Sequence, residues 1–301
     1  MIAITALQHD WGLSHRDIEQ AFCQSKIDTT EIYFTLPNGC DEFSGKVVKL
    51  NKSLYGLRES PRVFNQFLMS KLVAFGLKQC ASDPCIFRLT SLDGREVRLV
   101  VGVYVDDLIV TGESRCCREL RAFPQQTLPT KDLGILTYYV GCEYSRNRTA
   151  GTLRVTQTAC IDRLVEKFGP QENEEARCEK PYREAVGGLM WIANATRPDI
   201  SNAVREVARQ AHDPSEKHWR AVLKVIEYLK GTRDKGITYK KSPSIRLTAY
   251  ADSSFAENKQ DRRSVSGVLF FLAGGNLVVQ PNATLRNAKV PLRASTSRCR
   301  M

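Results

Sequence analysis

Two short runs of apolar, largely β-branched residues stand back to back within Val97–Gly112. Runs of about 4 to 8 such residues are typical of buried strands. The adjacent acids Asp106 and Asp107 separate the two runs, so the pattern predicts a tight hairpin with two carboxylates at its tip. Neither Gly, Asn nor Pro stands at this bend, although these residues usually form turns.

Two carboxylates held this close repel one another, by about 4 kcal/mol at ~4 Å and an effective dielectric of ~20. Such a pair is stable when cations neutralise it, so a divalent metal ion is the first hypothesis for Asp106 and Asp107. The alternative is a polar turn that happens to be acidic and binds nothing.

The chain before this hairpin predicts a mixture of helices and strands. Residues 1–13 are expected to be part of a helix, and Leu13–Phe22 passes from a short strand into a helix or turn, with Asp17 at the junction. Lys46–Leu50 is a brief strand. Apolar residues at helical spacing then predict an amphipathic helix from Pro61, which ends at Gly76.

The pattern after the hairpin alternates between the same two kinds of element. Cys116–Gln126 is a predicted helix, and Leu136–Tyr144 with Thr152–Thr156 is a predicted second hairpin. Thr158–Phe168 is a further helix. An acidic stretch without apolar residues, Pro170–Lys180, is the predicted linker.

Three helices and a set of strands complete the chain. The helices are Arg183–Ala195, Asp199–Ala211 and one that runs to Lys230, with Asp213 as its N-cap and Pro214 as its first residue. From Ile237 the apolar period returns to two, which predicts antiparallel strands. The final segment, 286–301, is basic without an apolar period and is predicted to be a disordered tail.

Composition narrows the possible functions. The net charge of +11 favours a polyanionic partner such as nucleic acid. The ten cysteines form no CxxC pair and the four histidines no ligand-like cluster, so neither a zinc site nor a disulfide framework is predicted. Free thiols point to a reducing, intracellular compartment. The N-terminus lacks the features of a signal peptide, and no apolar run could span a bilayer.

Several ordered motifs resemble one protein family. Tyr104–Asp107 in a hairpin with the upstream acid Asp17 is similar to the palm of a reverse transcriptase. The loop 50–62, and the segments 131–144, 182–200 and 250–267, resemble copia-type LTR-retrotransposon polymerases in the order that family shows. The resemblance covers most of residues 3–280. It implies an α+β fold with a palm of antiparallel sheet and packed helices, a helical thumb and connection, and an incomplete ribonuclease H-like end.

The resemblance also implies a chemistry and a set of roles. Two Mg²⁺ ions, or Mn²⁺ in their place, would support attack of a primer 3′-hydroxyl on a deoxynucleoside triphosphate. Asp17 and Asp106 would bridge the metals, Asp107 would complete the cluster, and the Ile18 carbonyl would be a further ligand. The nucleotide- and template-binding residues implied are Phe22, Tyr55, Gly56, Arg58, Pro61 and Tyr104. The implied primer grip is Tyr139, Val140 and Gly141, and the implied ribonuclease H carboxylate is Asp252.

Two of these assignments have structural alternatives. Phe22 resembles the platform that excludes a 2′-hydroxyl, but it could instead be a core residue. The hairpin that contains Tyr139 could be purely structural.

The expected domains follow the resemblance: 1–115 palm with partial fingers, 116–180 thumb-like region and linker, 181–236 helical connection, 237–285 truncated ribonuclease H-like strands, and 286–301 tail. Family members have fingers before position 1, a longer link between Phe168 and Tyr182, and a further ribonuclease H carboxylate beyond the strand that contains Val278. We therefore expect a fragment or decayed copy of a Gag-Pol-type polyprotein, impaired or inactive in isolation, without ribonuclease H activity.

The expected partners are an RNA or DNA template with its primer, deoxynucleoside triphosphates and other parts of the polyprotein, with no membrane. The family implies cytoplasmic virus-like particles or the nucleus, where DNA integration occurs. The main alternative function is a non-catalytic nucleic-acid-binding remnant, which would bind primer-template without extending it. A nucleotidyl cyclase with the same two-metal palm, and a merely basic α+β protein, are further alternatives.

Overall fold

The computed structural model describes residues 1–27, 31–39, 43–123, 128–169, 181–243, 246–253, 264–273, 275–284 and 299–300. The chain divides into two compact units, Met1–Leu136 and Thr137–Met301. Each unit is described by itself. Both contain antiparallel strands and helices, so the fold is mixed α+β as expected, while the five-part domain division stays a prediction.

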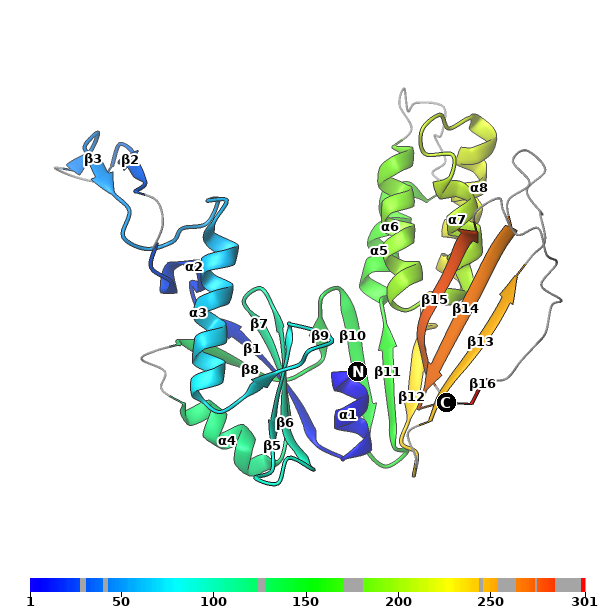
Figure 1. Ribbon diagram of the computed structural model, residues 1–301. Helices are drawn as coiled ribbons and strands as arrows, with labels where there is room; N and C mark the ends of the chain where they lie inside the picture. Colours follow the sequence, from blue (N-terminus) through cyan, green and yellow to red (C-terminus); the bar gives the residue numbers. More distant parts are fainter. Residues whose placement is uncertain are drawn as a thin grey trace. The chain divides into compact units, whose positions relative to one another are not determined.

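The first unit is organised around a six-stranded antiparallel sheet with the order β4-β5-β6-β7-β1-β8 (Figure 1). A separate two-stranded sheet pairs β2 with β3. The elements of this unit are α1 (Ile2–Gln8), β1 (Gly12–Ile18), α2 (Ala21–Gln24), β2 (Tyr33–Thr35), β3 (Val47–Lys49), α3 (Ser60–Ala74), β4 (Lys78–Gln79), β5 (Ile86–Thr90), β6 (Val97–Tyr104), β7 (Asp107–Gly112), α4 (Ser114–Ala122) and β8 (Thr130–Ile135).

Side chains of each strand alternate between the two faces of this sheet, and helices cover both faces. On one face, Val101, Val103, Leu108 and Val110 pack with buried residues of α3 and α4 in a single core. On the other face, Ile2 of α1 approaches Gly102 so closely that a Cβ there would lie 2.2 Å from its Cδ1. Because both faces are covered, β6 and β7 are apolar on both sides, and this explains the two uninterrupted β-branched runs.

The central predictions for this unit are confirmed. The two runs form β6 and β7, with Asp106 in the turn between them and Asp107 as the first residue of β7. The helix expected from Pro61 begins at Ser60 and ends two residues before Gly76. The helix in residues 1–13 is shorter than expected, because Gly12 already begins β1. The helix expected over Cys116–Gln126 is observed as Ser114–Ala122, and residues 124–127 lie outside the described residues.

The second unit contains two four-stranded antiparallel sheets, with the orders β12-β11-β10-β9 and β15-β14-β13-β16, and a group of helices. Its elements are β9 (Tyr138–Tyr139), β10 (Cys142–Asn147), β11 (Thr152–Thr156), α5 (Thr158–Phe168), α6 (Tyr182–Ala195), the 3₁₀ helix η3 (Pro198–Ile200), α7 (Ser201–Ala208), α8 (Glu216–Gly231), β12 (Ile237–Lys240), β13 (Leu247–Ser253), β14 (Ser264–Leu272), β15 (Gly275–Thr284) and β16 (Cys299–Arg300).

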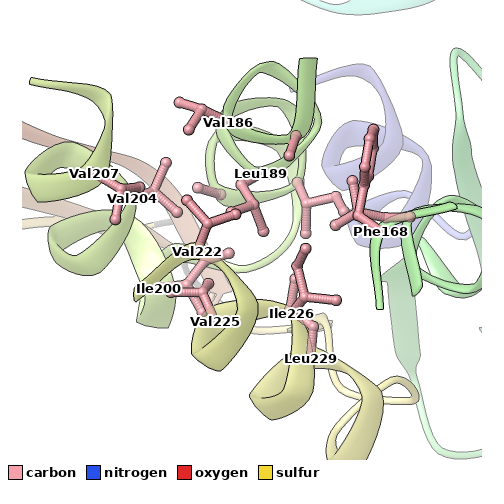
Figure 2. Packing of buried hydrophobic residues seen from close by; sticks show 14 of the residues in the cluster. Phe168, Val186, Leu189, Ile200, Val204, Val207, Val222, Val225, Ile226 and Leu229 are labelled. Atoms are coloured by element: carbon pink, nitrogen blue, oxygen red, sulfur yellow. The ribbon is translucent and has the colours of Figure 1, made fainter. Parts of the chain in front are cut away.

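The helices of this unit share one apolar core. Figure 2 shows Phe168, Leu189, Val222 and Ile226 converging from α5, α6 and α8. The buried guanidinium of Arg197 lies at the edge of this core, where it binds Asp199 through two nitrogens and donates to the Thr232 carbonyl at 2.9 Å. The end of α8 is thereby fastened to η3, and a buried charge is fully paired.

Two predictions for this unit need correction. The third helix does not begin with Asp213 and Pro214: Ser215 is its N-cap, and the Ser215 N–H donates to His218 Nδ1 at 3.0 Å in a reciprocal capping box. This pair satisfies two terminal donors of the helix. In addition, the strand predicted over Leu136–Tyr144 is interrupted by a turn at Val140 and Gly141, so that only its second part belongs to β10, which pairs with β11.

Two predicted segments fall largely outside the described residues. The linker Pro170–Lys180 lies outside the described residues, as does most of the basic tail. Within the tail, Cys299 and Arg300 form β16 beside β13.

Candidate active site

The three candidate acids of the first unit come together although they are far apart in the chain. Strands β1 and β7 pair with Asp17 directly opposite Asp107. The Ile18 N–H donates to the Asp106 carbonyl at 2.9 Å, which extends the same ladder to the hairpin tip. Directly opposite residues of an antiparallel pair project from the same face, so Asp17 and Asp107 share a face and Asp106 lies at its end.

The hairpin tip has a constrained backbone. Tyr104 pairs with Asp107, and Val105 and Asp106 form the two-residue turn between them. Val105 has a φ of 58°, which is rare for a β-branched residue and costs about 1–3 kcal/mol. In a tight hairpin turn with positive φ at the first central residue alone, glycine usually occupies that position. The turn therefore holds Asp106 in place at a cost in stability.

The electrostatics of the site reflect the proximity of the acids. Burial raises the pKa of Asp17, and the negative charges of Asp106 and Asp107 raise it further. His15 has the opposite, smaller effect on this pKa. The cluster is therefore short of positive charge, as expected for a site that would accept a cation.

Two neighbours of the acids were not identified from the sequence. His15 Nε2 lies 2.6 Å from Asp107 Oδ1. Lys131 of β8 stands directly opposite Asp17 on the other side of β1. Strand alternation could have indicated His15, because it is two residues before Asp17. Nothing local could have indicated Lys131, since its position depends on the register of a strand far along the chain.

The donor set suits a hard divalent cation, because carboxylate and carbonyl oxygens are the ligands that Mg²⁺ prefers. Across the part of the chain that the structure describes, however, no three His, Cys, Asp or Glu side chains converge to hold a metal ion. The carboxylate of Asp107 is bonded to His15 instead. The backbone positions and the donor types thus fit a metal site, and metal binding would require the side chains to rotate.

The loop with the nucleotide-binding candidates lies against this site. The rings of Phe22 and Tyr55 have centroids 4.7 Å apart, and Phe22 also contacts the core residue Phe64 at 5.7 Å. Burial raises the pKa of Tyr55, and the charge of Asp106 adds to the increase. Phe22 therefore lies between the core and an exposed tyrosine beside the acids.

Hydrogen bonds fix this loop to the elements around it. The Ser53 N–H donates to the Ser25 carbonyl at 2.9 Å, and the buried hydroxyls of Ser53 and Ser60 are 2.5 Å apart. Between these anchors, Gly56 has a φ of 94°, which L side chains rarely adopt. Further along, Arg58 is exposed and Pro61 lies in the first turn of α3.

The other candidates lie in the second unit. Tyr139 pairs with Cys142, and Val140 and Gly141 form the turn between β9 and β10. This turn packs on α5, where Cys160 Sγ donates to the Gly141 carbonyl at 3.3 Å. Asp252 lies in β13 opposite Gly267 of β14. The hairpin predicted with Thr152–Thr156 is observed as β10 with β11, and the roles of all these residues remain predictions.

No helix within the described ranges is both long enough and apolar enough to cross a membrane.

Comparisons with known proteins identify the family of this chain. The family model described as reverse transcriptase (RNA-dependent DNA polymerase) matches residues 1–181. The chain is 30% identical over 294 residues to the retrovirus-related Pol polyprotein from transposon TNT 1-94 of Nicotiana tabacum, covering 88% of this chain and 22% of that protein. It is 31% identical over 288 residues to the corresponding polyprotein from transposon RE1 of Arabidopsis thaliana, covering 89% and 19%.

A relative of similar length is the putative transposon Ty5-1 protein of Saccharomyces cerevisiae, which is 26% identical over 282 residues, covering 86% of this chain and 89% of that protein. The chain spans about a fifth of the length of the two polyproteins. With the family model matched over more than half of its residues, the chain belongs to the reverse transcriptase (RNA-dependent DNA polymerase) family, and its relatives are Pol polyproteins of copia-type retrotransposons.

Proposed function

We propose that this chain is an RNA-directed DNA polymerase region that transfers deoxynucleotides to a primer 3′-hydroxyl by a two-metal reaction. The observation that carries the proposal is the ladder register, which places Asp17 opposite Asp107 and brings the backbone of Asp106 to Ile18. An acidic turn without a function would not require a third acid, Asp17, from a strand 89 residues before Asp106. The family membership of residues 1–181 agrees with this assignment.

The acids would hold two Mg²⁺ ions, which supply charge stabilisation for the attacking and leaving oxygens of an in-line displacement. In this proposal Asp17 and Asp106 bind both ions, Asp107 completes the cluster, and the Ile18 carbonyl is a further ligand. The rigid β1–β7 ladder fixes the backbone of these residues before substrate arrives. Such preorganisation lowers the cost of assembling the site in the transition state.

Phe22 and Tyr55 are proposed to select the nucleotide. Their rings contact one another beside the acids, so a sugar bound at the metals would lie over Phe22. A ring at this position leaves no room for a 2′-hydroxyl. Gly56 and its exposed neighbour Arg58 would support the nascent base pair and a template phosphate.

The remaining candidates complete this proposal. Tyr104 and Pro61 would line the nucleotide site, and the turn at Tyr139–Gly141 would hold the primer backbone. Strands β13–β15 with Asp252 would be the ribonuclease H-like part of the chain. The expected partners are primer-template, deoxynucleoside triphosphates and other parts of a polyprotein of the kind its relatives are named for.

A second candidate is a nucleic-acid-binding protein without catalysis. It is favoured by the net charge of +11 and by side chains that do not converge on a metal position within the described ranges. This candidate predicts salt-sensitive, sequence-independent binding to primer-template, since affinity would come from phosphate contacts.

One experiment separates the two candidates. The purified chain is incubated with a labelled primer on an RNA template, deoxynucleoside triphosphates and Mg²⁺, and the products are resolved on a gel while binding is measured by fluorescence anisotropy. Extension that EDTA abolishes supports the polymerase. Binding without extension supports the second candidate and contradicts the first.

A further inference from the structure

The contact between His15 and Asp107 divides the three acids into two groups. His15 Nε2 and Asp107 Oδ1 are 2.6 Å apart, and the two side chains are only 15% and 30% exposed. A hydrogen bond this short to a carboxylate is among the strong ones. It needs only an N–H at Nε2, which the neutral Nε2 tautomer supplies as well as the protonated ring does.

The strand register makes this contact specific. His15 stands opposite Ile109 of β7 and opposite Gly134 of β8. Neither neighbour offers a polar side chain, and Asp107 is the diagonal residue on the same face. Asp107 is fixed in turn, because it begins β7 directly after the constrained turn at Val105.

Asp106 has a different position. It lies in the turn itself, and its carbonyl accepts from the Ile18 N–H, so its backbone is tied to the residue that follows Asp17. A carboxylate with both oxygens available can bridge two metal ions, one oxygen to each ion. Asp107 has one oxygen occupied by His15.

We propose, on the basis of the polymerase function above, that His15 is a positioning residue that holds Asp107 out of the metal-bridging pair. Asp17 and Asp106 then bridge the metals alone, and Asp107 contributes its charge from beside them. Outer partners of metal ligands typically change metal affinity by about 10- to 100-fold, and here the change would have the sign set by which oxygens His15 leaves available.

The test is Mn²⁺ binding to the full chain, measured by electron paramagnetic resonance of the free ion, which requires no catalysis. We expect D106N to weaken Mn²⁺ binding more than about 10-fold and D107N to change it less than about 3-fold. H15L should release Asp107 to become a ligand and tighten binding about 10-fold. Adding D107N to H15L should restore the affinity of the parent chain.

Two variants control for folding and chemistry. H15Q keeps an N–H donor in reach of Asp107 and should bind Mn²⁺ like the parent, while H212L removes an exposed histidine and should change nothing. Thermal melting identifies any variant that fails to fold; if H15L does, the comparison of D107N with D106N decides.

The outcomes distinguish this inference from the proposed function. If D107N weakens Mn²⁺ binding as much as D106N, or if H15L binds like the parent, the role of His15 is contradicted and the metal site stands. If the parent chain binds no Mn²⁺, the proposed metal site fails and this inference fails with it.

Discussion

The molecule contains two tight hairpins that differ in what their turns hold. In the first unit, Val105 and Asp106 connect β6 to β7, and a positive φ occurs at Val105 alone. In the second unit, Val140 and Gly141 connect β9 to β10, with φ of 44° and 73°. Positive φ at both central residues is the type I′ pattern, for which a glycine at the second position is usual.

The two turns differ in what their residues contact and in the charge they present. Gly141 allows close packing, because a Cβ there would lie 3.2 Å from Trp191 Nε1. Burial raises the pKa of the neighbouring Cys142 thiol to about 11, so that thiol stays protonated at neutral pH. Both turns contain a valine at positive φ, but only the turn at Val105 is followed by two acids. One strained turn packs against a helix, and the other presents charge.

The largest expected effect is on the acidic hairpin. D106N keeps the size of the side chain but removes the charge that would bind two metals, so primer extension should fall more than about 100-fold, beyond the range of outer-sphere changes. The measurement is the rate of extension at saturating Mg²⁺. D93N, in an exposed turn of the same unit, should leave the rate unchanged; equal losses in both variants would contradict the role of Asp106.

A change in the packing hairpin should affect stability instead. G141A places a methyl group against Trp191 and Cys160 at a positive φ, so the free energy of unfolding should fall by about 1–2 kcal/mol. Urea denaturation measures this change. G187A is the matched control, because Gly187 is exposed within α6 with open space around it and should gain up to about 1 kcal/mol. A stabilised G141A would show that the turn is not packed as described.

Nucleotide selection tests whether Phe22 acts together with the acids of the first hairpin. F22A removes the ring beside Tyr55, so discrimination between deoxynucleotides and ribonucleotides should relax about 10-fold or more. The measurement is the ratio of kcat/KM for the two substrates. F75A, which removes a ring paired with Phe123 elsewhere in the unit, should lower stability without changing that ratio. Unchanged selectivity in F22A would assign Phe22 to the core alone.

Replacing each strained valine, Val105 and Val140, with glycine compares the two turns directly. V105G and V140G should each raise the free energy of unfolding by about 1 kcal/mol, since relief of strain exceeds the entropy that glycine adds to the unfolded chain. Only V105G should also slow extension, because it loosens the backbone that presents Asp106. Denaturation with extension assays on both variants measures this, and a loss of activity in V140G alone would reverse the comparison.

The smallest effect is on pH dependence. Burial, Asp106 and Asp107 raise the pKa of Asp17, so the folded state binds this proton more tightly than the unfolded state. Protonated Asp17 therefore stabilises the folded state at low pH. This stabilisation is lost as the pH rises from the unfolded-state pKa of about 3.9 through the raised pKa of the folded state. D17N should be more stable than the parent at pH 7, by less than about 1 kcal/mol, and equal to it at pH 3.

Asp199 provides the control of opposite sign. Burial alone would raise the pKa of Asp199, but hydrogen bonds from Arg197 and Tyr228 lower it below the ordinary value. D199N should therefore be less stable than the parent at pH 7. Urea denaturation at the two pH values measures both variants, and a D17N variant less stable than the parent at pH 7 would contradict the repulsion in the cluster.

The sequence predicted those parts of the fold that depend on local pattern. The helix at Thr158–Phe168 was predicted with its observed bounds, and the two β-branched runs form β6 and β7. The predicted start of α8 was wrong. Asp213-Pro214 is a strong local signal for a helix start, but the observed N-cap is Ser215, which forms a reciprocal capping box with His218.

The candidate site shows where local reasoning ends. Nearness of Asp17 to the hairpin was expected only from the family resemblance, since the register of β1 on β7 is a tertiary property. His15 and Lys131 become neighbours of the acids through that register and that of β8. The partner of β12 depends likewise on which edge is available after folding.

The most direct test of the central claim, that residues 17, 106 and 107 surround one metal site, is cleavage of the chain by bound Fe²⁺ with ascorbate and peroxide. Hydroxyl radicals formed at the bound ion cut nearby backbone, and the fragments are identified by mass spectrometry. The account predicts cuts near Asp17 and near Asp106–Asp107 in the same reaction, both suppressed by excess Mg²⁺ and both lost in D106N. Cuts at only one of these positions, or at neither, would contradict it.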